Sequence, residues 1–141
     1  MGQQQLLLLV LATVIVGLAT VAGIQAFNEN QQQAKQDALI QRTNALAQDL
    51  AAAAEKPSQL GGVSFKSDNA TKVAKSIGLS SDTEISAGGA GTSAGCKITT
   101  SSSSATVECG SDGADSGTIT VYVTVTPAND DPIGDPSISV T

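Results

Sequence analysis

The chain begins with its longest apolar stretch. Residues 1–28 carry no ionisable side chain, and Leu6–Ile24 is almost continuously apolar, with the sequence LLLLVLATVIVGLATVAGI. A helix over Leu6–Ile24 spans roughly 28 Å at ~1.5 Å per residue, which matches the ~30 Å hydrocarbon thickness of a bilayer. The pattern therefore predicts a helix that needs lipid or other apolar helices around it.

The helical pattern continues without a break into a polar stretch that ends before Pro57. Small and apolar residues recur there at spacings of three, four and seven, which indicates one narrow apolar face. We expect this face to pack on the chain's own domain. The alternative is a coiled coil with another chain, because Leu39, Leu46 and Ala53 share a heptad position. The residues of the face are Ala34, Ala38, Leu39, Ala45, Leu46, Leu50 and Ala53.

The segment from Cys96 to Cys109 predicts a β-hairpin with a disulfide between its strands. Folding it about Ser102-Ser103 brings the cysteines opposite each other, as a non-hydrogen-bonded pair whose Cα atoms lie ~4.5 Å apart. The other expected pairs are Ile98 with Val107 and Lys97 with Glu108. Because Ser-Ser is not a preferred turn pair, a four-residue loop over Ser101–Ser104 is an equal alternative. The bridge indicates an oxidising, extracytoplasmic location.

Other segments predict shorter elements. Strict alternation over Thr118–Thr126 is typical of a half-buried antiparallel strand, with the long helix as cover for its apolar side. We also expect an edge strand at Ser137–Val140, a short helix within Asn69–Gly78 and a surface loop with nothing to bury over residues 87–95.

These elements predict an α+β fold in which a long N-terminal helix, its apolar half protruding, packs on a small antiparallel β-sheet head. The helix covers residues 1–56, with an apolar assembly or membrane segment over 1–27 and an amphipathic half over 28–56. The head covers residues 57–141. It has no Trp and few large apolar residues, which are spread between Leu60 and Val140 and include Ile133. A domain with so small a hydrophobic core needs a covalent crosslink or a partner segment that covers the core.

The composition excludes several classes of function. The net charge is −6. Because the chain has no His and only two Cys, it lacks the residue for His-based catalysis and the usual ligand sets for zinc and haem. We expect no enzyme, no cofactor and no metal, and the acidic surface disfavours nucleic acid. Acid-rich turns at residues 112–117 and 129–135 leave calcium as an alternative to solvated acids. Asn69-Ala70-Thr71 and Ser101–Ser104 leave glycosylation open.

The extreme N-terminus contains three glutamines, Gln3, Gln4 and Gln5, directly before the leucines. Amides beside a hydrocarbon-buried helix are costly unless they are hydrogen-bonded, so they lie at the membrane interface or bond to neighbouring helices. No Lys or Arg precedes the apolar run. We therefore expect that a basic leader is removed and that Met1 is the mature terminus.

This layout resembles that of type IV pilins and pilin-like proteins, and its sequence-specific part is confined to Met1–Phe27. Members lose a short leader before a hydrophobic N-terminal helix, whose second half packs on a β-sheet head that often holds a disulfide. Most begin with a methylated Phe and carry glutamate where Gln5 stands here. The resemblance implies that an amide hydrogen bond from Gln5 replaces the charge pairing of that glutamate.

The resemblance implies a structural subunit that is anchored in the inner membrane and then polymerises, with the pilus assembly machinery, into an extracellular filament at the cell surface. Its partner is itself, in a helical homopolymer. The alternatives are a pseudopilin of a secretion system and a membrane-anchored extracytoplasmic binding domain. The expected assembly residues are Met1, Gln3, Gln4, Gln5, Leu6, Leu7, Leu8, Leu9, Val10, Leu11, Val14, Ile15, Leu18, Val21, Ile24 and Phe27.

Overall fold

A computed structural model describes residues 2–66, 68–114, 116–127 and 137–140 of the chain. By its internal contacts the chain falls into two compact units, Met1–Ala34 (unit 1) and Lys35–Thr141 (unit 2). Each unit is described by itself. The domain boundary predicted at residues 56 and 57 follows the end of the long helix and stays a prediction.

Helix α1 runs from Gly2 to Glu55 without interruption, so the prediction of one long N-terminal helix is confirmed. Unit 1 consists of its first part. The helix stops before Pro57, whose ring cannot continue it. The chain then forms the short 3-10 helix η1 (Ser58–Leu60), and Gly61 follows in the left-handed conformation with φ of 84°.

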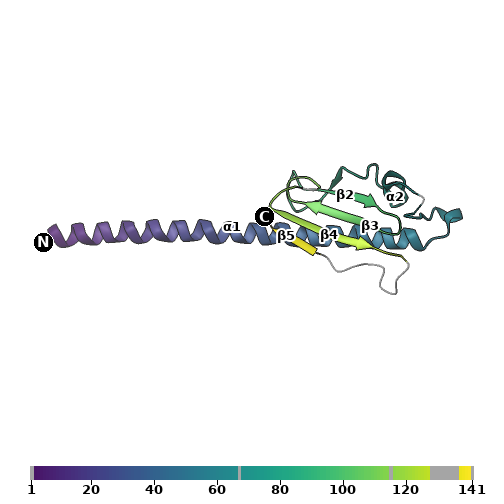
Figure 1. The fold of residues 1–141 in the computed structure, drawn as a ribbon. Coiled ribbons are helices and arrows are strands. Elements are labelled where there is room, and N and C mark those ends of the chain that lie inside the picture. Colours follow the sequence, from purple (N-terminus) through teal and green to yellow (C-terminus); the bar gives the residue numbers. More distant parts are fainter. Residues whose placement is uncertain (1, 67, 115, 128–136, 141) are drawn as a thin grey trace. The chain divides into compact units, whose positions relative to one another are not determined.

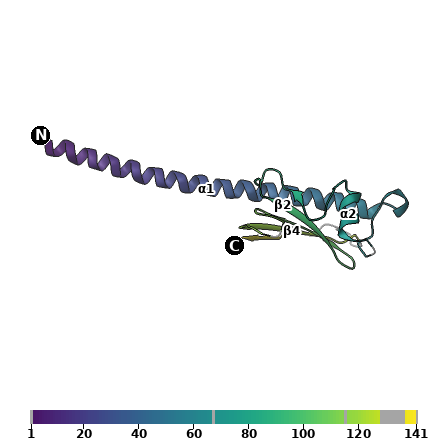
Figure 2. The ribbon, with the colours of Figure 1, turned by 90° about the horizontal axis from the view of Figure 1, so that it is seen from above.

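Unit 2 contains one antiparallel sheet of five strands in the order β1-β2-β3-β4-β5. Their bounds are β1 Ile85–Ser86, β2 Gly95–Thr100, β3 Ala105–Gly110, β4 Ile119–Val125 and β5 Ser137–Val140. The hairpin, the alternating strand and the edge strand are therefore confirmed. Figures 1 and 2 show the sheet lying along the part of α1 that belongs to unit 2.

The hairpin has the predicted register. Cys96 lies opposite Cys109, Lys97 opposite Glu108 and Ile98 opposite Val107. A disulfide joins the cysteines, whose Cα atoms are 4.0 Å apart. Four residues, Ser101–Ser104, connect the two strands, and the Ser101 N–H donates to the Ser104 carbonyl at 2.8 Å, with Ser102 and Ser103 at the tip.

The core of unit 2 lies between α1 and the sheet. Leu39, Leu46 and Leu50 of α1 are buried in one cluster with the inward side chains of the hairpin and of β4. The coiled-coil alternative is therefore wrong at the heptad positions, because the chain's own sheet covers them. Ala34 and Ala45 are exposed, so they do not belong to the packed face as expected. From the sheet, the cluster includes Cys96, Ile98, Ala105, Val107, Cys109, Ile119, Val121, Val123 and Val125.

Helix α2 (Ala70–Ser76) forms where it was expected, within Asn69–Gly78. The side chain of Asn69 caps it by accepting from the Lys72 N–H at 2.9 Å. Gly78 follows with φ of 83°, which a residue with a side chain adopts at a cost.

Two expectations about the head are wrong. The glycine-rich loop over residues 87–95 buries Ala87, Ala90 and Ala94, because these small side chains fit closely against the unit 2 core. Leu60, a candidate core residue, is 76 % exposed. It is the last residue of η1, which lies beyond the end of α1 and before the chain turns back towards that helix. Ile133 lies outside the residues that the structure describes.

Candidate functional site

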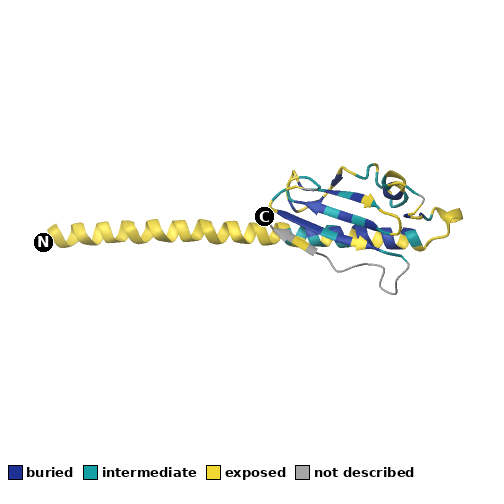
Figure 3. Cartoon of the chain, in the orientation of Figure 1, coloured by how far each residue is buried: buried dark blue, intermediate teal, exposed yellow. Residues whose placement is uncertain are grey.

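The side chains of unit 1 form an apolar surface that extends around α1. The large apolar side chains are between 50 and 71 % exposed, and Figure 3 shows this part of the helix exposed along its length. All expected assembly residues except Met1, which lies outside the described part, are on this surface: Gln3, Gln4, Gln5, Leu6, Leu7, Leu8, Leu9, Val10, Leu11, Val14, Ile15, Leu18, Val21, Ile24 and Phe27.

The two hydroxyl groups inside this apolar surface are bonded within the helix. Thr13 donates its hydroxyl to the Val10 carbonyl at 2.8 Å, and Thr20 donates to the Gly17 carbonyl at 2.8 Å. The helix also satisfies its own backbone groups beyond the first turn. This part of α1 can therefore enter an apolar environment without leaving unpaired polar groups in its middle.

Gln3, Gln4 and Gln5 differ from these hydroxyl groups, because their amides are exposed at the start of the helix. Gln3 lines a shallow groove with Leu6, Leu7 and Val10. An amide buried in such surroundings without a partner costs about 1 to 3 kcal/mol. The predicted role of Gln5 in bonding to a neighbouring subunit stays a prediction.

By length and composition alone, α1 contains a stretch that is able to cross a membrane. The first charged residue is Glu29, after the last residue of the apolar segment. Gly17 and Gly23 lie within this stretch, and an added Cβ at either would meet nothing within 4 Å. Another helix can therefore approach the backbone closely at these positions.

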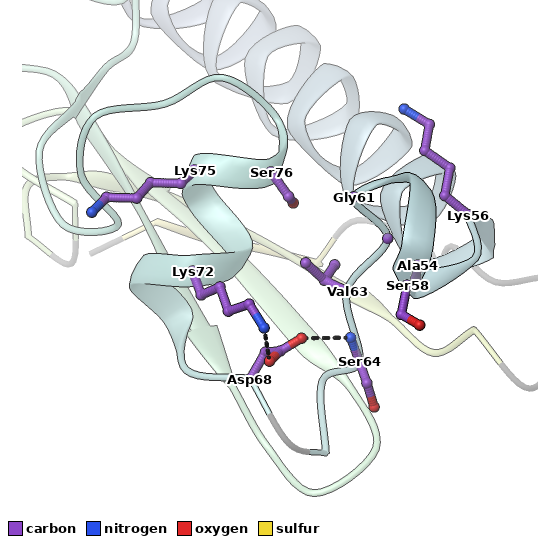
Figure 4. Close-up of a pocket in the computed structure, with 11 residues that line it drawn as sticks. Ala54, Lys56, Ser58, Gly61, Val63, Ser64, Asp68, Lys72, Lys75 and Ser76 are labelled. Carbon is purple, nitrogen blue, oxygen red and sulfur yellow. Dashed lines mark hydrogen bonds and ion pairs between the residues drawn. The ribbon is translucent and has the colours of Figure 1, made fainter.

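Unit 2 has a groove that sequence reasoning missed, drawn in Figure 4. It lies between the end of α1, the segment after η1 and α2, and it has a volume of about 660 Å³. Lys56, Lys72 and Lys75 line it together with hydroxyl groups and Asp68. The sequence feature that could have indicated this groove is the clustering of charge, because four of the seven cationic residues of the chain fall within residues 56–75.

Asp68 ties two sides of this groove together. One carboxylate oxygen accepts from the Lys72 ammonium at 2.6 Å, and the other accepts from the Ser64 N–H at 3.0 Å (Figure 4). The hydrogen bond from Lys72, followed by that from Ser64, lowers the pKa of Asp68 from its ordinary value. In Figure 4 the ammonium groups of Lys56 and Lys75 lie on opposite sides of the view, so they do not converge on one point.

The acid-rich turns proposed as calcium ligands are described only in part. Asp112 is exposed, and its carbonyl accepts a hydrogen bond from the Ser116 hydroxyl. Asp115, Asp130, Asp131 and Asp135 lie outside the described residues. Within the described ranges, no three His, Cys, Asp or Glu side chains gather as metal ligands.

Comparison of the chain with protein-family models, with curated proteins and with solved structures finds no match. The established description is therefore that of a long N-terminal apolar helix whose second half packs on a small, disulfide-bonded antiparallel sheet.

Proposed function

We propose that the protein is a structural subunit of an extracellular filament of the type IV pilus kind, held in the inner membrane before assembly. Residues 1–27 of α1 anchor the free subunit in lipid and pack against the same residues of other subunits in the filament. The heads form the outer layer. The role requires no catalysis and no cofactor.

The exposed apolar surface of unit 1 is the observation that carries this proposal. The large apolar side chains from Leu6 to Phe27 are at least half exposed among the residues that the structure describes. Burial of such surface is favourable by roughly 25 cal/mol per Å². Lipid covers it in a single subunit, and neighbouring helices cover it in a polymer, where the same contact is repeated along the fibre.

The lack of charge around this segment supports polymerisation over simple anchoring. Stable membrane anchors usually keep lysine or arginine near their ends. The described part of unit 1 has no lysine or arginine, and Glu29 is its one charged residue. The disulfide of unit 2 supports an oxidising compartment for the head.

Electron microscopy of sheared surface material from cells that produce the protein tests the proposal. We expect filaments in which this chain is the main component by mass spectrometry. A protein that stays in the membrane fraction as a monomer, with no filament under any growth condition, would contradict the proposal and favour the membrane-anchored binding domain.

A further inference from the structure

The part of α1 that belongs to unit 2 has a face that the sheet does not cover. Its exposed positions recur at helical spacing and carry three carboxylates, no lysine or arginine, and small or amide side chains between them. We call it the acidic face. Its residues are Asp37, Gln41, Ala45, Gln48, Asp49, Ala52 and Glu55.

The opposite charge gathers on the segments that follow α1. Four exposed lysines and one aspartate fall within residues 56–75, which gives this stretch a charge of +3, while the rest of the chain carries −9. Among the described residues only Lys72 of these four lysines has an ion pair, with Asp68. Lys66 lines a neighbouring hollow that shares Val63 and Ser64 with the groove of Figure 4.

An exposed apolar residue lies in the chain between Lys56 and Lys66. Leu60 is 76 % exposed and is the most exposed large apolar residue in the described part of unit 2. Its neighbours in the chain, Ser58 and Gly61, line the groove of Figure 4. An exposed leucine next to a groove lined by lysines has the composition of an interface anchor with a polar rim. We call Lys56, Leu60, Lys66, Lys72 and Lys75 together the basic end.

We propose that the basic end of one copy docks on the acidic face of α1 in a second copy, with Leu60 against Ala45 and Ala52. The inference rests on the proposed function, because it names a contact between heads in that filament. The charges are opposite: residues 56–75, which contain the basic end and Asp68, carry +3, and the acidic face carries −3. Because the two surfaces differ, the contact is heterologous and generates an open-ended polymer when it repeats.

A second copy fits these observations better than a small anion or a polyanion. The ammonium groups of Lys56 and Lys75 lie well apart (Figure 4), so they suit carboxylates that are spread out. From Asp37 to Glu55 the acidic face extends roughly 27 Å along the helix at ~1.5 Å per residue. A polyanion would also be repelled by the −9 of the remaining chain. Between copies of net charge −6, complementary surfaces offset the general repulsion.

Zero-length crosslinking of filaments tests the contact directly. Full-length protein in two isotopic forms is mixed, assembled and treated with a carbodiimide, which joins amines to carboxylates in contact. We expect links between Lys66 or Lys75 of one isotopic form and Asp37, Asp49 or Glu55 of the other. Lys56 is not used, because it lines a hollow with Asp49 of its own chain. Links between chains that avoid both surfaces would overturn the proposal.

Charge reversal gives the energetic test. Lys75→Glu is expected to lower the amount of filament by about tenfold or more at low salt, and Asp49→Lys in the same chain is expected to restore part of it. The matched controls are Lys35→Glu and Glu84→Lys, which change exposed charges outside both surfaces and should have little effect. Leu60→Ser is expected to weaken assembly without unfolding the head, because the side chain is exposed.

The outcomes separate this contact from the proposed function. Wild-type protein that forms no filament overturns both. Filaments that form equally well in Lys75→Glu, Asp49→Lys and Leu60→Ser overturn the contact and leave the proposed function standing. A Lys75→Glu variant that assembles normally but loses retention on a phosphate-bearing resin assigns the basic end to a polyanion, and likewise overturns the contact.

Discussion

Asp68 connects the segment after η1 to α2 through two hydrogen bonds to different carboxylate oxygens. Both bonds favour the ionised form, so the pKa of Asp68 is lower in the folded protein than its ordinary value. The stabilising contribution is therefore complete above the unfolded pKa of about 4 and is lost as the pH falls through the lower, folded pKa.

Asp68→Asn is expected to lower the thermal stability of unit 2 slightly at about pH 7, because the amide cannot pair with Lys72 as an anion. The difference from wild type is expected to be smaller at about pH 2, below the unfolded pKa, because protonation of Asp68 removes the charge that distinguishes the two side chains. Thermal unfolding of both proteins at the two pH values checks this. A difference that is equal at both pH values would show that shape, and not charge, is what Asp68 contributes.

Gln5 is the polar residue closest to the leucines of unit 1. In a filament core its amide needs a partner, which we expect to be the terminal amine or backbone of a neighbour near residues 1–4. Gln5→Leu should keep membrane insertion, since it makes the segment more apolar, but should lower filament yield and change the axial register. Filaments of normal yield and unchanged helical rise would show that apolar packing alone sets the register.

At the scale of elements, the β2–β3 hairpin is closed by the disulfide, with a sequence separation of 13 between the cysteines. The loop-closure account gives roughly 3 kcal/mol of stabilisation for a loop of this length. The double variant Cys96→Ala and Cys109→Ala should therefore lower the free energy of unfolding by about this amount. Chemical denaturation of a fragment over residues 28–141 measures it, and peptide mapping that finds two free thiols in the native protein would remove its basis.

Leu50 and Leu60 differ completely in exposure and form a pair for comparison. Leu50 of α1 is 0 % exposed, whereas Leu60 of η1 is 76 % exposed. Leu50→Ala should cost about 2 to 5 kcal/mol of unfolding free energy, because it leaves a cavity between helix and sheet. Leu60→Ala should change stability by less than about 0.5 kcal/mol. Equal losses at both positions would show that Leu60 is covered within the folded subunit.

The elements that could be predicted are those with a long, regular pattern. The apolar run and its polar continuation predicted α1, and the alternation in the hairpin and in Ile119–Val125 predicted register and inward face. Strand β1 has two residues, too few for any period to be visible. The loop over residues 87–95 was misjudged because burial of Ala90 depends on tertiary contact and not on a local pattern.

The candidate functional sites likewise include one that the sequence predicts and one that it does not. The exposed apolar surface of unit 1 could be predicted, because Leu6–Ile24 is almost continuously apolar, and its role in assembly stays a proposal. The groove of Figure 4 could not, since its lysines come from the residue after α1 and from α2, and they line one groove only after the chain reverses at Gly61 and Gly62. The exposure of Leu60 likewise follows from where η1 ends, which composition does not reveal.

At the scale of the whole molecule, the two units are suited to opposite environments, water for unit 2 and apolar surroundings for unit 1. Unit 2 contains the complete buried cluster of the described residues and is expected to be soluble by itself. The apolar residues of unit 1 are exposed, and in the proposed function lipid or other copies of the same helix cover them. Polymerisation through residues 1–27 is therefore the central claim.

Electron microscopy of purified full-length protein during slow detergent removal without lipid tests this claim most directly, with the fragment over residues 28–141 as the control. We expect the full-length protein to form helical filaments of uniform diameter and the fragment to stay monomeric. Amorphous aggregates or small micelle-like oligomers of the full-length protein, or filaments formed by the fragment, would contradict assembly through the N-terminal helix.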